Sequence, residues 1–402
     1  MKKSSKKLAL FGGSKILNQK KEHYIWPPKQ DFRVISKHLR SNYISKKGYP
    51  FVVEKFEKVF AKLVGTKFAL ATNSGTSALH AAYFALNIKK NDEVILPTLT
   101  FHATGTPLLK FTKKIKFCGC DEVGNINIKE LRKLVTKKTK LVVITHIGGH
   151  PCEMDEIMSL KKKYNFKLVE DCSHSHESRY KGRKVGTFGE INVFSMDRNK
   201  LLSVGEGGVL VTNSQTFFEK SLLVTDFGSR IQNEIKLKKN KTFVESGFGF
   251  KHRIHPVAAA IALSELTKLK KYIKMRHARL NYFSKKLMKI PGLIPPITKE
   301  YVNRGAFYSY RITIKNTLLK KMNLSLFIKA LNKEGLNARV SGNRPLHQLP
   351  YFKICKPNKI KSAERYYNSS VSIPTFTFEK YELINLYLKG FEKVCNYLNE
   401  KK

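Results

Sequence analysis

The sequence predicts an α/β protein with a large domain, built on a mostly parallel central sheet flanked by helices, and a smaller C-terminal α/β domain. Short apolar segments alternate with helical stretches from about residue 66, which is typical of strand–helix–strand units around a buried parallel sheet. From about residue 300 the order of the elements changes, which indicates a second unit. The 402 residues leave room for two or three domains at roughly 150 residues each. A hydrophobic content of 42% is enough for a large core and argues against a disordered chain.

The large domain is predicted from seven apolar runs, each short enough to be a buried strand. They occupy residues 67–72, 92–97, 114–120, 140–146, 167–171, 191–195 and 207–212. Helices are predicted between them at 77–86, from Asn127 onwards and over 153–163. The helix that opens at Asn127 has capping-box spacing, because Glu130 follows three residues later.

A long helix that begins at about residue 256 is predicted to bridge to the second unit. Its apolar residues follow at helical spacing and are Ala262, Leu266, Leu269 and Ile273. The second unit is predicted as a strand at 309–314, a helix at 324–333, a strand at 338–341 and a final helix near 378–398. The basic N-terminal residues, which contain the apolar segment LALFGG, are interpreted as an arm. The expected division is an arm (1–30), a large domain (31–275) and a small C-terminal domain (276–402).

The chain is strongly basic, with a formal net charge of +46 at pH 7. Such a charge first suggests nucleic acid, but only fifteen of the 76 Lys and Arg residues are arginine, and the lysines are spread along the whole chain. Base readout relies on arginine, and single-strand grooves interleave basic with aromatic residues. We therefore expect no specific nucleic-acid partner, weak salt-sensitive adhesion to polyanions, and attraction of a negatively charged substrate.

The cysteines and the N-terminus indicate the compartment. Six irregularly spaced cysteines do not form a disulfide framework in a chain of this length, and Cys118 and Cys120 are interpreted as reduced thiols at a strand end. The opening residues lack the apolar core of about 7–15 residues that a secretory signal needs. No apolar run approaches the ~20 residues that span a bilayer. We expect a cytoplasmic protein that has no membrane segment.

Ligands of open parallel sheets bind beyond the carboxyl ends of the strands. Gly75 and Thr76 lie between a predicted strand and a helix, where free N–H groups and the helix dipole favour a phosphate; an ordinary helix start is an equal alternative. Asp171 ends an apolar strand, so its carboxylate must be solvated or paired. It is either the partner of a protonated ring nitrogen, as in a pyridoxal cofactor, or the N-cap of the next segment.

Lys200 follows the predicted strand 191–195 and precedes a glycine-rich turn at 205–208, which bulky residues do not make easily. A lysine held in a partly dry site has a lowered pKa and becomes a nucleophilic amine. In so lysine-rich a chain, position and neighbours single out this one.

Five motifs occur in a fixed order. They are NSGTSAL (73–79); DEVILP (92–97) with TFHA (100–103); EDCSHSH (170–176); YKG (180–182) with Val185-Gly186; and Phe194-Ser195 with Lys200 and GEGG (205–208). In this order and spacing they resemble the DegT/DnrJ/EryC1/StrS sugar aminotransferases, pyridoxal-phosphate enzymes of the aspartate-aminotransferase fold (fold type I). The resemblance covers most of the chain.

The resemblance implies a role for each matched residue. Lys200 resembles the lysine that joins the cofactor covalently and later moves the proton between substrate and cofactor, and Asp171 resembles the partner of the pyridine nitrogen. Phe101 matches the aromatic residue that stacks on the cofactor ring, and His174 lies where the family has Gln or His near the phenolic oxygen. The positions that match phosphate-binding residues are Gly75, Thr76 and Ser195.

Two departures from the family pattern bear on the site. The loop before Lys200 reads MDRN (196–199), where many members have an aromatic residue and a Pro-Thr pair, so the substrate pocket is expected to differ. Lys251 stands where an Asn usually reaches the cofactor phosphate of the neighbouring subunit; a lysine can do so as a point charge. The resemblance implies a homodimer with shared active sites.

The function implied is transfer of an amino group from glutamate or glutamine to a keto sugar, expected to be nucleotide-linked, or to a related cyclic ketone. A sugar dehydratase of the same fold normally lacks the lysine, so Lys200 argues against it. A cofactor-binding or polyanion-binding protein without turnover remains a second alternative. A third is a metal-dependent hydrolase, if the four histidines His146, His150, His174 and His176 cluster around an ion. We favour the aminotransferase, with no metal.

Overall fold

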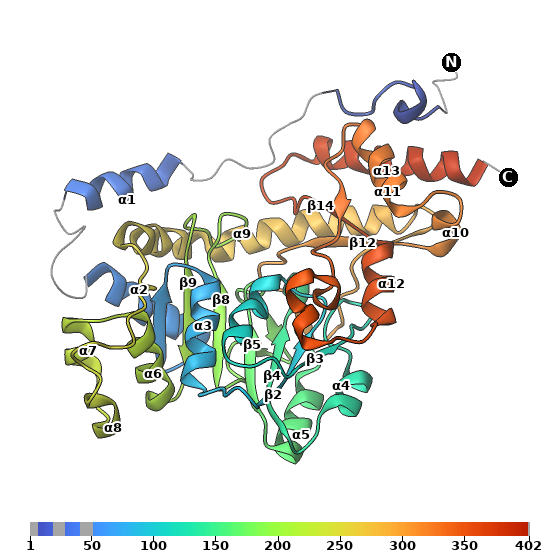
Figure 1. The fold of residues 1–402 in the computed structure, drawn as a ribbon. Helices are drawn as coiled ribbons and strands as arrows, with labels where there is room; N and C mark the ends of the chain where they lie inside the picture. The colour runs from blue at the N-terminus through green and yellow to red at the C-terminus, as the bar shows by residue number, and fades with distance from the viewer. Residues whose placement is uncertain (1–6, 19–28, 41–50, 401–402) are drawn as a thin grey trace.

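The computed structural model describes residues 7–18, 29–40 and 51–400 (Figure 1). Seven strands form its large sheet: β1 (Phe68–Thr72), β2 (Glu93–Pro97), β3 (Ile115–Cys118), β4 (Thr139–Thr145), β5 (Lys167–Asp171), β8 (Ile191–Ser195) and β9 (Gly208–Thr212). Their spatial order is β1-β9-β8-β5-β4-β2-β3. All neighbours pair in parallel except β9, which is antiparallel to β1 and to β8. The predicted α/β fold with a mostly parallel sheet is confirmed.

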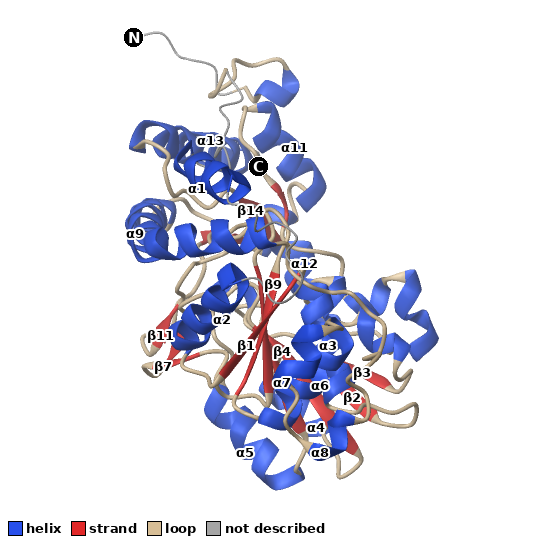
Figure 2. Ribbon diagram, turned by 90° about the vertical axis from the view of Figure 1, so that its left-hand side faces the viewer, coloured by secondary structure: helices blue, strands red, loops and turns tan. Residues whose placement is uncertain are grey.

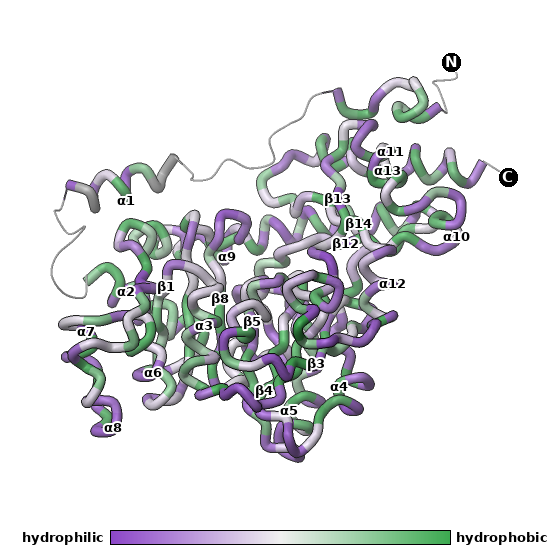
Figure 3. The backbone as a smooth tube through the Cα atoms, in the orientation of Figure 1, coloured by the Kyte–Doolittle hydropathy of each residue, from purple (hydrophilic) through white to green (hydrophobic). Residues whose placement is uncertain are grey.

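Helices cover both faces of this sheet, because both faces of its strands are apolar. Along β2, for example, Val94 and Leu96 belong to one hydrophobic cluster and Ile95 to another. One face is covered by α3 (Gly75–Ala85) and α6 (Gln215–Thr225). The other is covered by α2 (Phe51–Val64), α4 (Ile128–Leu134), α5 (Met154–Tyr164) and the first part of α9 (Pro256–Leu287). Figure 2 shows α2 on one side of the strands and α3 and α6 on the other, and Figure 3 shows hydrophilic residues along the outer loops.

A second, antiparallel sheet lies in the C-terminal part of the chain. Its strands, in spatial order, are β10 (Leu293–Ile294), β12 (Tyr310–Ile314), β14 (Ser370–Ile373) and β13 (Arg339–Val340). The end of α9 packs against it together with α11 (Leu324–Lys333) and α13 (Tyr381–Glu400). Leu8 and Leu17 of the N-terminal arm are buried in the same core, so the arm is part of the small unit's packing.

The remaining elements lie around these two sheets. The helices are α1 (Lys29–Arg40), α7 (Ser229–Glu234), α8 (Lys238–Lys241), α10 (Asn316–Leu319) and α12 (Lys361–Ser369). The strands β6 (Arg179–Tyr180), β7 (Arg183–Lys184) and β11 (Val302–Asn303) form a small antiparallel sheet in the order β11-β6-β7. Short 3-10 helices are η1 (Ala9–Phe11), η2 (His102–Thr104), η3 (Thr106–Lys110), η4 (Ile147–Gly149), η5 (Leu346–Gln348) and η6 (Pro350–Cys355).

Local predictions agree with these elements at most positions. Asn127 is the N-cap of α4, where its side chain accepts a hydrogen bond from the Glu130 N–H at 3.1 Å. All six cysteines are free. Helix α9 continues without a break past residue 276, so a boundary between residues 275 and 276 would lie within a helix, and the division into 1–30, 31–275 and 276–402 stays a prediction. Among the described residues, no helix combines the length and apolar character that crossing a membrane requires.

Candidate active site

A cavity of about 500 Å³ lies at the edge of the large sheet where β1, β2, β4, β5 and β8 end. Residues from the small sheet and the loop before it, including Tyr308 and Arg339, close its other side. Seven of the predicted site residues line this cavity: Gly75, Thr76, Phe101, Asp171, His174, Ser195 and Lys200. The residues predicted from the sequence therefore belong to one continuous site, which lies between the two sheets.

The N-terminus of α3 forms a cradle for an anion. Ser74 is its N-cap and accepts a hydrogen bond from the Ser77 N–H at 3.1 Å. The first N–H groups of a helix have no acceptor within the helix, so those of Gly75 and Thr76 are available to a phosphate. The backbone is packed tightly here: a Cβ at Gly208 would lie 2.4 Å from the Ser74 carbonyl, and one at Gly75 would lie 3.0 Å from the Ser195 Cβ. Both glycines are needed for this close approach.

Asp171 is a buried carboxylate at the carboxyl end of β5. Its Oδ2 accepts a hydrogen bond from the Thr104 hydroxyl at 2.7 Å, and its Oδ1 accepts one from the Ser173 N–H at 3.1 Å. No lysine or arginine of the described residues forms an ion pair with it. A buried carboxylate without a cation is costly, so a protonated ring nitrogen is a fitting partner. The hydrogen bond that Asp171 accepts from the Ser173 N–H is compatible with its pairing to a ring nitrogen.

Lys200 lies over an aromatic pair. Its Nζ is 3.9 Å from the ring centroid of Tyr308, and that ring stacks on His174 with 4.0 Å between centroids. Burial, followed by the charges of Lys200 and Arg311, lowers the pKa of His174 well below its ordinary value, so its imidazole is neutral. The Gly148 N–H approaches the Nδ1 of His174 at 3.4 Å, which places the imidazole proton on Nε2, where it can be donated.

Phe101 and Lys251 occupy different surroundings. Phe101 is 47% exposed, at the N-cap of η2 in the cavity wall, and an exposed aromatic face inside a cavity is available for stacking. Lys251 does not line the cavity; it is exposed, and its Nζ lies 5.7 Å from the ring centroid of Phe227. Its predicted contact is with a neighbouring subunit and stays a prediction.

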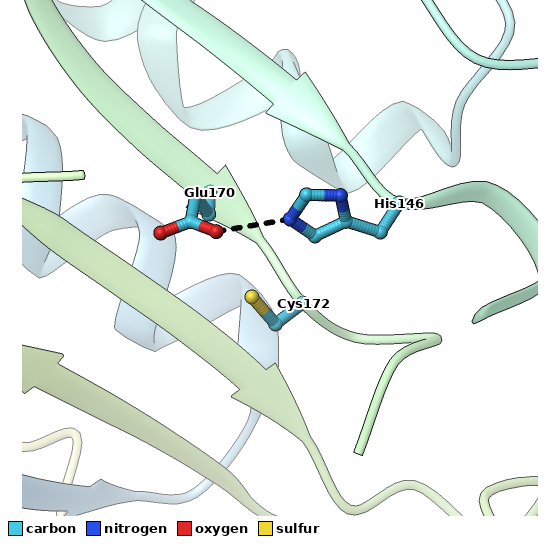
Figure 4. A group of neighbouring side chains, drawn as sticks. All are labelled: His146, Glu170 and Cys172. Carbon is cyan, nitrogen blue, oxygen red and sulfur yellow. Dashed lines mark hydrogen bonds and ion pairs between the residues drawn. The ribbon is translucent and has the colours of Figure 1, made fainter. Parts of the chain in front are cut away.

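Three potential metal ligands do lie together beside the sheet: His146, Glu170 and Cys172, all buried (Figure 4). The Nε2 of His146 is 3.0 Å from the Glu170 carboxylate, and its Nδ1 accepts a hydrogen bond from the Cys152 N–H. Glu170 also accepts hydrogen bonds from the backbone N–H groups of residues 186, 188 and 189. Both imidazole nitrogens and the carboxylate are thus already engaged, which favours a structural role for this group.

The four-histidine metal site does not form in the part of the chain that the structure describes, because these histidines have separate surroundings. The Nδ1 of His150 lies 2.8 Å from the Pro151 carbonyl oxygen. His176 packs between the rings of Phe60 and Phe194. The hydrolase alternative therefore loses its structural basis.

A second cleft, of about 1440 Å³, meets the cavity at Lys200 and Tyr308. The arm forms part of its wall through Lys15 and Leu17, and helix α11 forms another part. A substrate longer than the cavity can extend into this cleft.

Some residues that hold the site together were not predicted from the sequence. Thr104 bonds to Asp171 and to the Thr100 hydroxyl, which bonds in turn to Thr145. Thr100 carried a signal, because it belongs to the matched motif at 100–103. Tyr308 had none, because its contacts with Lys200 and His174 depend on how the small domain packs on the large one.

The residues present fit pyridoxal phosphate. The tight backbone at Gly75 and Gly208 leaves an N–H cradle for its phosphate, and Asp171 lies buried without a cation among the described residues. Lys200 supplies an amine at the same cavity. Fold and site together define the class of pyridoxal-phosphate-dependent aminotransferases.

Comparison with known proteins identifies the family. A model of the DegT/DnrJ/EryC1/StrS aminotransferase family matches residues 28–382, and the chain belongs to this family. GDP-perosamine synthase of Escherichia coli O157:H7 is 34% identical over 63% of this chain and 67% of its own length. UDP-4-amino-4,6-dideoxy-N-acetyl-beta-L-altrosamine transaminase of Campylobacter jejuni is 30% identical over 80% and 84%. The structure of an aminotransferase from Psychrobacter cryohalolentis superposes with a TM-score of 0.87 at 25% identity, covering 94% of this chain and all of that one.

Proposed function

We propose that this enzyme transfers an amino group from glutamate or glutamine to a nucleotide-linked keto sugar, or to a related cyclic ketone, in two half-reactions. The observation that carries the proposal is that Lys200, Asp171 and the N-terminus of α3 face one cavity. An amine, a ring partner and a phosphate cradle are the three groups that amino transfer with pyridoxal phosphate requires.

Each residue of the site would have its own role in the reaction. The N–H groups of Gly75 and Thr76 and the Ser195 hydroxyl would hold the phosphate, and Phe101 would stack on the ring. Asp171 would keep the ring nitrogen protonated, and the cofactor would then supply the electron sink. Lys200 would move the proton at the reacting carbon, as general base and then as general acid. The neutral His174 would donate from Nε2 to the ring's phenolic oxygen.

Three observations support a nucleotide-linked acceptor. Two relatives bear names of enzymes that make GDP- or UDP-linked amino sugars. The cleft of about 1440 Å³ beside Lys200 gives a long substrate room. The net charge of +46 attracts a pyrophosphate group.

A homodimer with shared active sites is part of the proposal. Four exposed phenylalanines precede Lys251 in the sequence: Phe227, Phe243, Phe248 and Phe250. Exposed apolar side chains gathered in one region are typical of an interface. A second copy covering them would bring Lys251 towards its neighbour's cofactor phosphate. We also place the reaction in the cytoplasm, as expected from the sequence.

The test uses the purified protein with pyridoxal phosphate. A band at about 410–430 nm is expected for cofactor joined to a lysine, and glutamate or glutamine should change it. The variant Lys200→Ala should lose the lysine-bound band, whereas Lys138→Ala, at an exposed surface lysine, should keep it. A panel of nucleotide keto sugars should then accept the amino group.

Each alternative function has its own outcome in this test. A band that no amino acid changes would favour a cofactor-binding protein and overturn the proposal. Deoxygenation of the sugar in place of amination would favour a dehydratase. A band that survives in Lys200→Ala would remove the assignment of that lysine.

A further inference from the structure

Three residues of the small sheet stand in one row that faces the cavity. Arg311 on β12 pairs with Ser372 on β14, and Arg339 on β13 pairs with the same Ser372. Directly paired residues of neighbouring strands point to the same face of a sheet, and all three line the cavity that Lys200 also lines. Because strands lie about 4.8 Å apart, the backbones of the two arginines are about 10 Å apart.

Neither arginine has a carboxylate partner. Among the residues that the structure describes, no Asp or Glu forms an ion pair with the guanidinium of Arg311 or Arg339. The hydrogen-bond partner of Arg311 is neutral, because its Nε donates to the Ser309 hydroxyl at 3.1 Å. The Nη1 of Arg311 is buried and has no hydrogen-bond partner within the described chain. A buried, unpaired guanidinium nitrogen is costly unless a ligand completes it.

The backbone makes room for the Arg311 guanidinium. Gly342, at φ +76°, lies beside it, and a Cβ there would come 3.3 Å from the Arg311 Nη2. A larger residue at 342 would be strained by its backbone angle and would crowd the guanidinium.

Three carboxylates also line the cavity, but each has other surroundings. Asp171 is bonded to Thr104, and the Asp197 carboxylate accepts hydrogen bonds from Asn199. Glu206 is exposed. Among the described residues, none of these carboxylates forms an ion pair with Arg311 or Arg339, so both guanidinium groups are available to a ligand that carries carboxylates.

We infer that Arg311 and Arg339 bind the two carboxylates of a dicarboxylic amino donor, with Arg311 on the α-carboxylate and Arg339 on the distal one. The inference rests on the proposed function and specifies its donor site. Guanidinium groups bind carboxylates through two parallel hydrogen bonds, which fixes orientation as well as affinity.

The position of Arg311 indicates that it binds a carboxylate of the donor and not the phosphates of the acceptor. The α-carboxylate is attached directly to the carbon that reacts, so its binding group must lie beside the reacting residues. Arg311 meets that requirement, because it lines the same cavity as Lys200 and His174. The pyrophosphate of a nucleotide sugar is separated from the reacting carbon by the sugar ring and belongs further out. Arg339 also borders the larger cleft and is exposed, as suits the distal carboxylate.

The experiment measures the donor half-reaction of the holoenzyme, followed by the absorbance change with L-glutamate or L-glutamine and no acceptor. Variants Arg311→Met and Arg339→Met are compared with Arg365→Met, an exposed arginine of the same domain that lines neither the cavity nor the larger cleft. For Arg311→Met, the half-saturating concentration of both donors should rise by at least about 10- to 100-fold, which is the effect of losing one of the two charge-assisted hydrogen bonds. Arg339→Met should weaken glutamate about 10-fold and leave glutamine unchanged. Binding of UDP and GDP, measured by calorimetry, should be unchanged in both variants.

The outcomes separate this inference from the proposed function. If the wild-type enzyme is loaded by neither amino acid, the proposed function fails. If wild type is loaded and both variants behave like Arg365→Met, only the inference fails. It also fails if UDP and GDP binding falls while glutamate saturation does not, or if only the maximal rate changes. Should Arg311→Met not fold, Arg311→Lys, which keeps the charge and loses the fork, gives the same readout beside Arg339→Met.

Discussion

The close approach between Gly208 and the start of α3 leads to a quantitative prediction for Gly208→Ala. The new Cβ would lie 2.4 Å from the Ser74 carbonyl and 2.5 Å from the Gly75 nitrogen, and both are backbone atoms that cannot rotate away. Ordinary contact begins at 3.4 Å, so the N-terminus of α3 must move by about 1 Å, an overpacking that costs about 1–3 kcal/mol. A shift of that size lengthens the N–H contacts to a bound phosphate beyond hydrogen-bond range. Loss of one charge-assisted hydrogen bond weakens cofactor binding about 10- to 100-fold.

Gly182→Ala is the matched control for that prediction. Gly182 has φ +80°, and a Cβ added there would meet nothing within 4 Å, so alanine strains the backbone by about 1–2 kcal/mol without touching the cradle. Both variants should therefore lose stability in urea, and only Gly208→Ala should lose affinity for pyridoxal phosphate, measured by titration of the apoenzyme. Equal cofactor affinity in the two variants would refute the reasoning that Gly208 positions the phosphate cradle.

Three further predictions follow from the structure. Asp171→Asn should retain the fold and lower kcat about 100- to 1000-fold, because a neutral amide does not hold a protonated ring nitrogen; a smaller loss in steady-state assays would contradict the pairing. Glu334→Ala should cost about 1–3 kcal/mol in urea unfolding and expose residues 7–18 to trypsin, since its carboxylate accepts hydrogen bonds from the Ala9 N–H at 2.8 Å and from the Lys393 Nζ at 2.9 Å; an arm that stays protected would exclude this role. Burial lowers the pKa of His176 to about 3 in the folded chain, against 6.5 for an exposed histidine. The unfolded chain therefore binds more protons below pH 6.5, and stability falls with pH from 6.5 towards 3 by about 1.4 kcal/mol per pH unit for this residue. His176→Phe should flatten the acid side of a stability–pH curve by that slope, and an unchanged slope would show that His176 is not the titrating group.

The strands of the large sheet could be predicted because each is a self-contained apolar run. The run at 140–146, for example, contains four consecutive apolar residues at 141–144, and β4 lies at Thr139–Thr145. The spatial order of the strands could not be predicted in the same way, since it depends on pairings between distant segments. The antiparallel insertion of β9 between β1 and β8 is such a pairing.

The residues proposed to hold the cofactor could be predicted for a related reason. Asp171 and Ser195 each end a predicted strand of one parallel sheet, so their carboxyl ends meet at one edge and their side chains share a cavity. The residues that hydrogen-bond to them could not be predicted from the sequence. Thr104 lies 67 residues from Asp171 along the chain, and only the path of η2 over the sheet edge brings the two together.

The arginine row in the small domain was hidden by one missed strand. Strand β14 has four residues, of which only Val371 and Ile373 are apolar, so its sequence signal is weak. Yet it is the central partner that sets the row, because Ser372 pairs with a residue from each of its neighbours. Without it, Arg311 and Arg339 are two basic residues among 76; with it, they share a face towards Lys200. The lysine could be predicted because the motifs next to it in the sequence identify it. The arginines could not, because their shared position depends on the pairing register of three strands. Residues that recognise a substrate can therefore escape prediction in a sequence whose catalytic lysine is predicted.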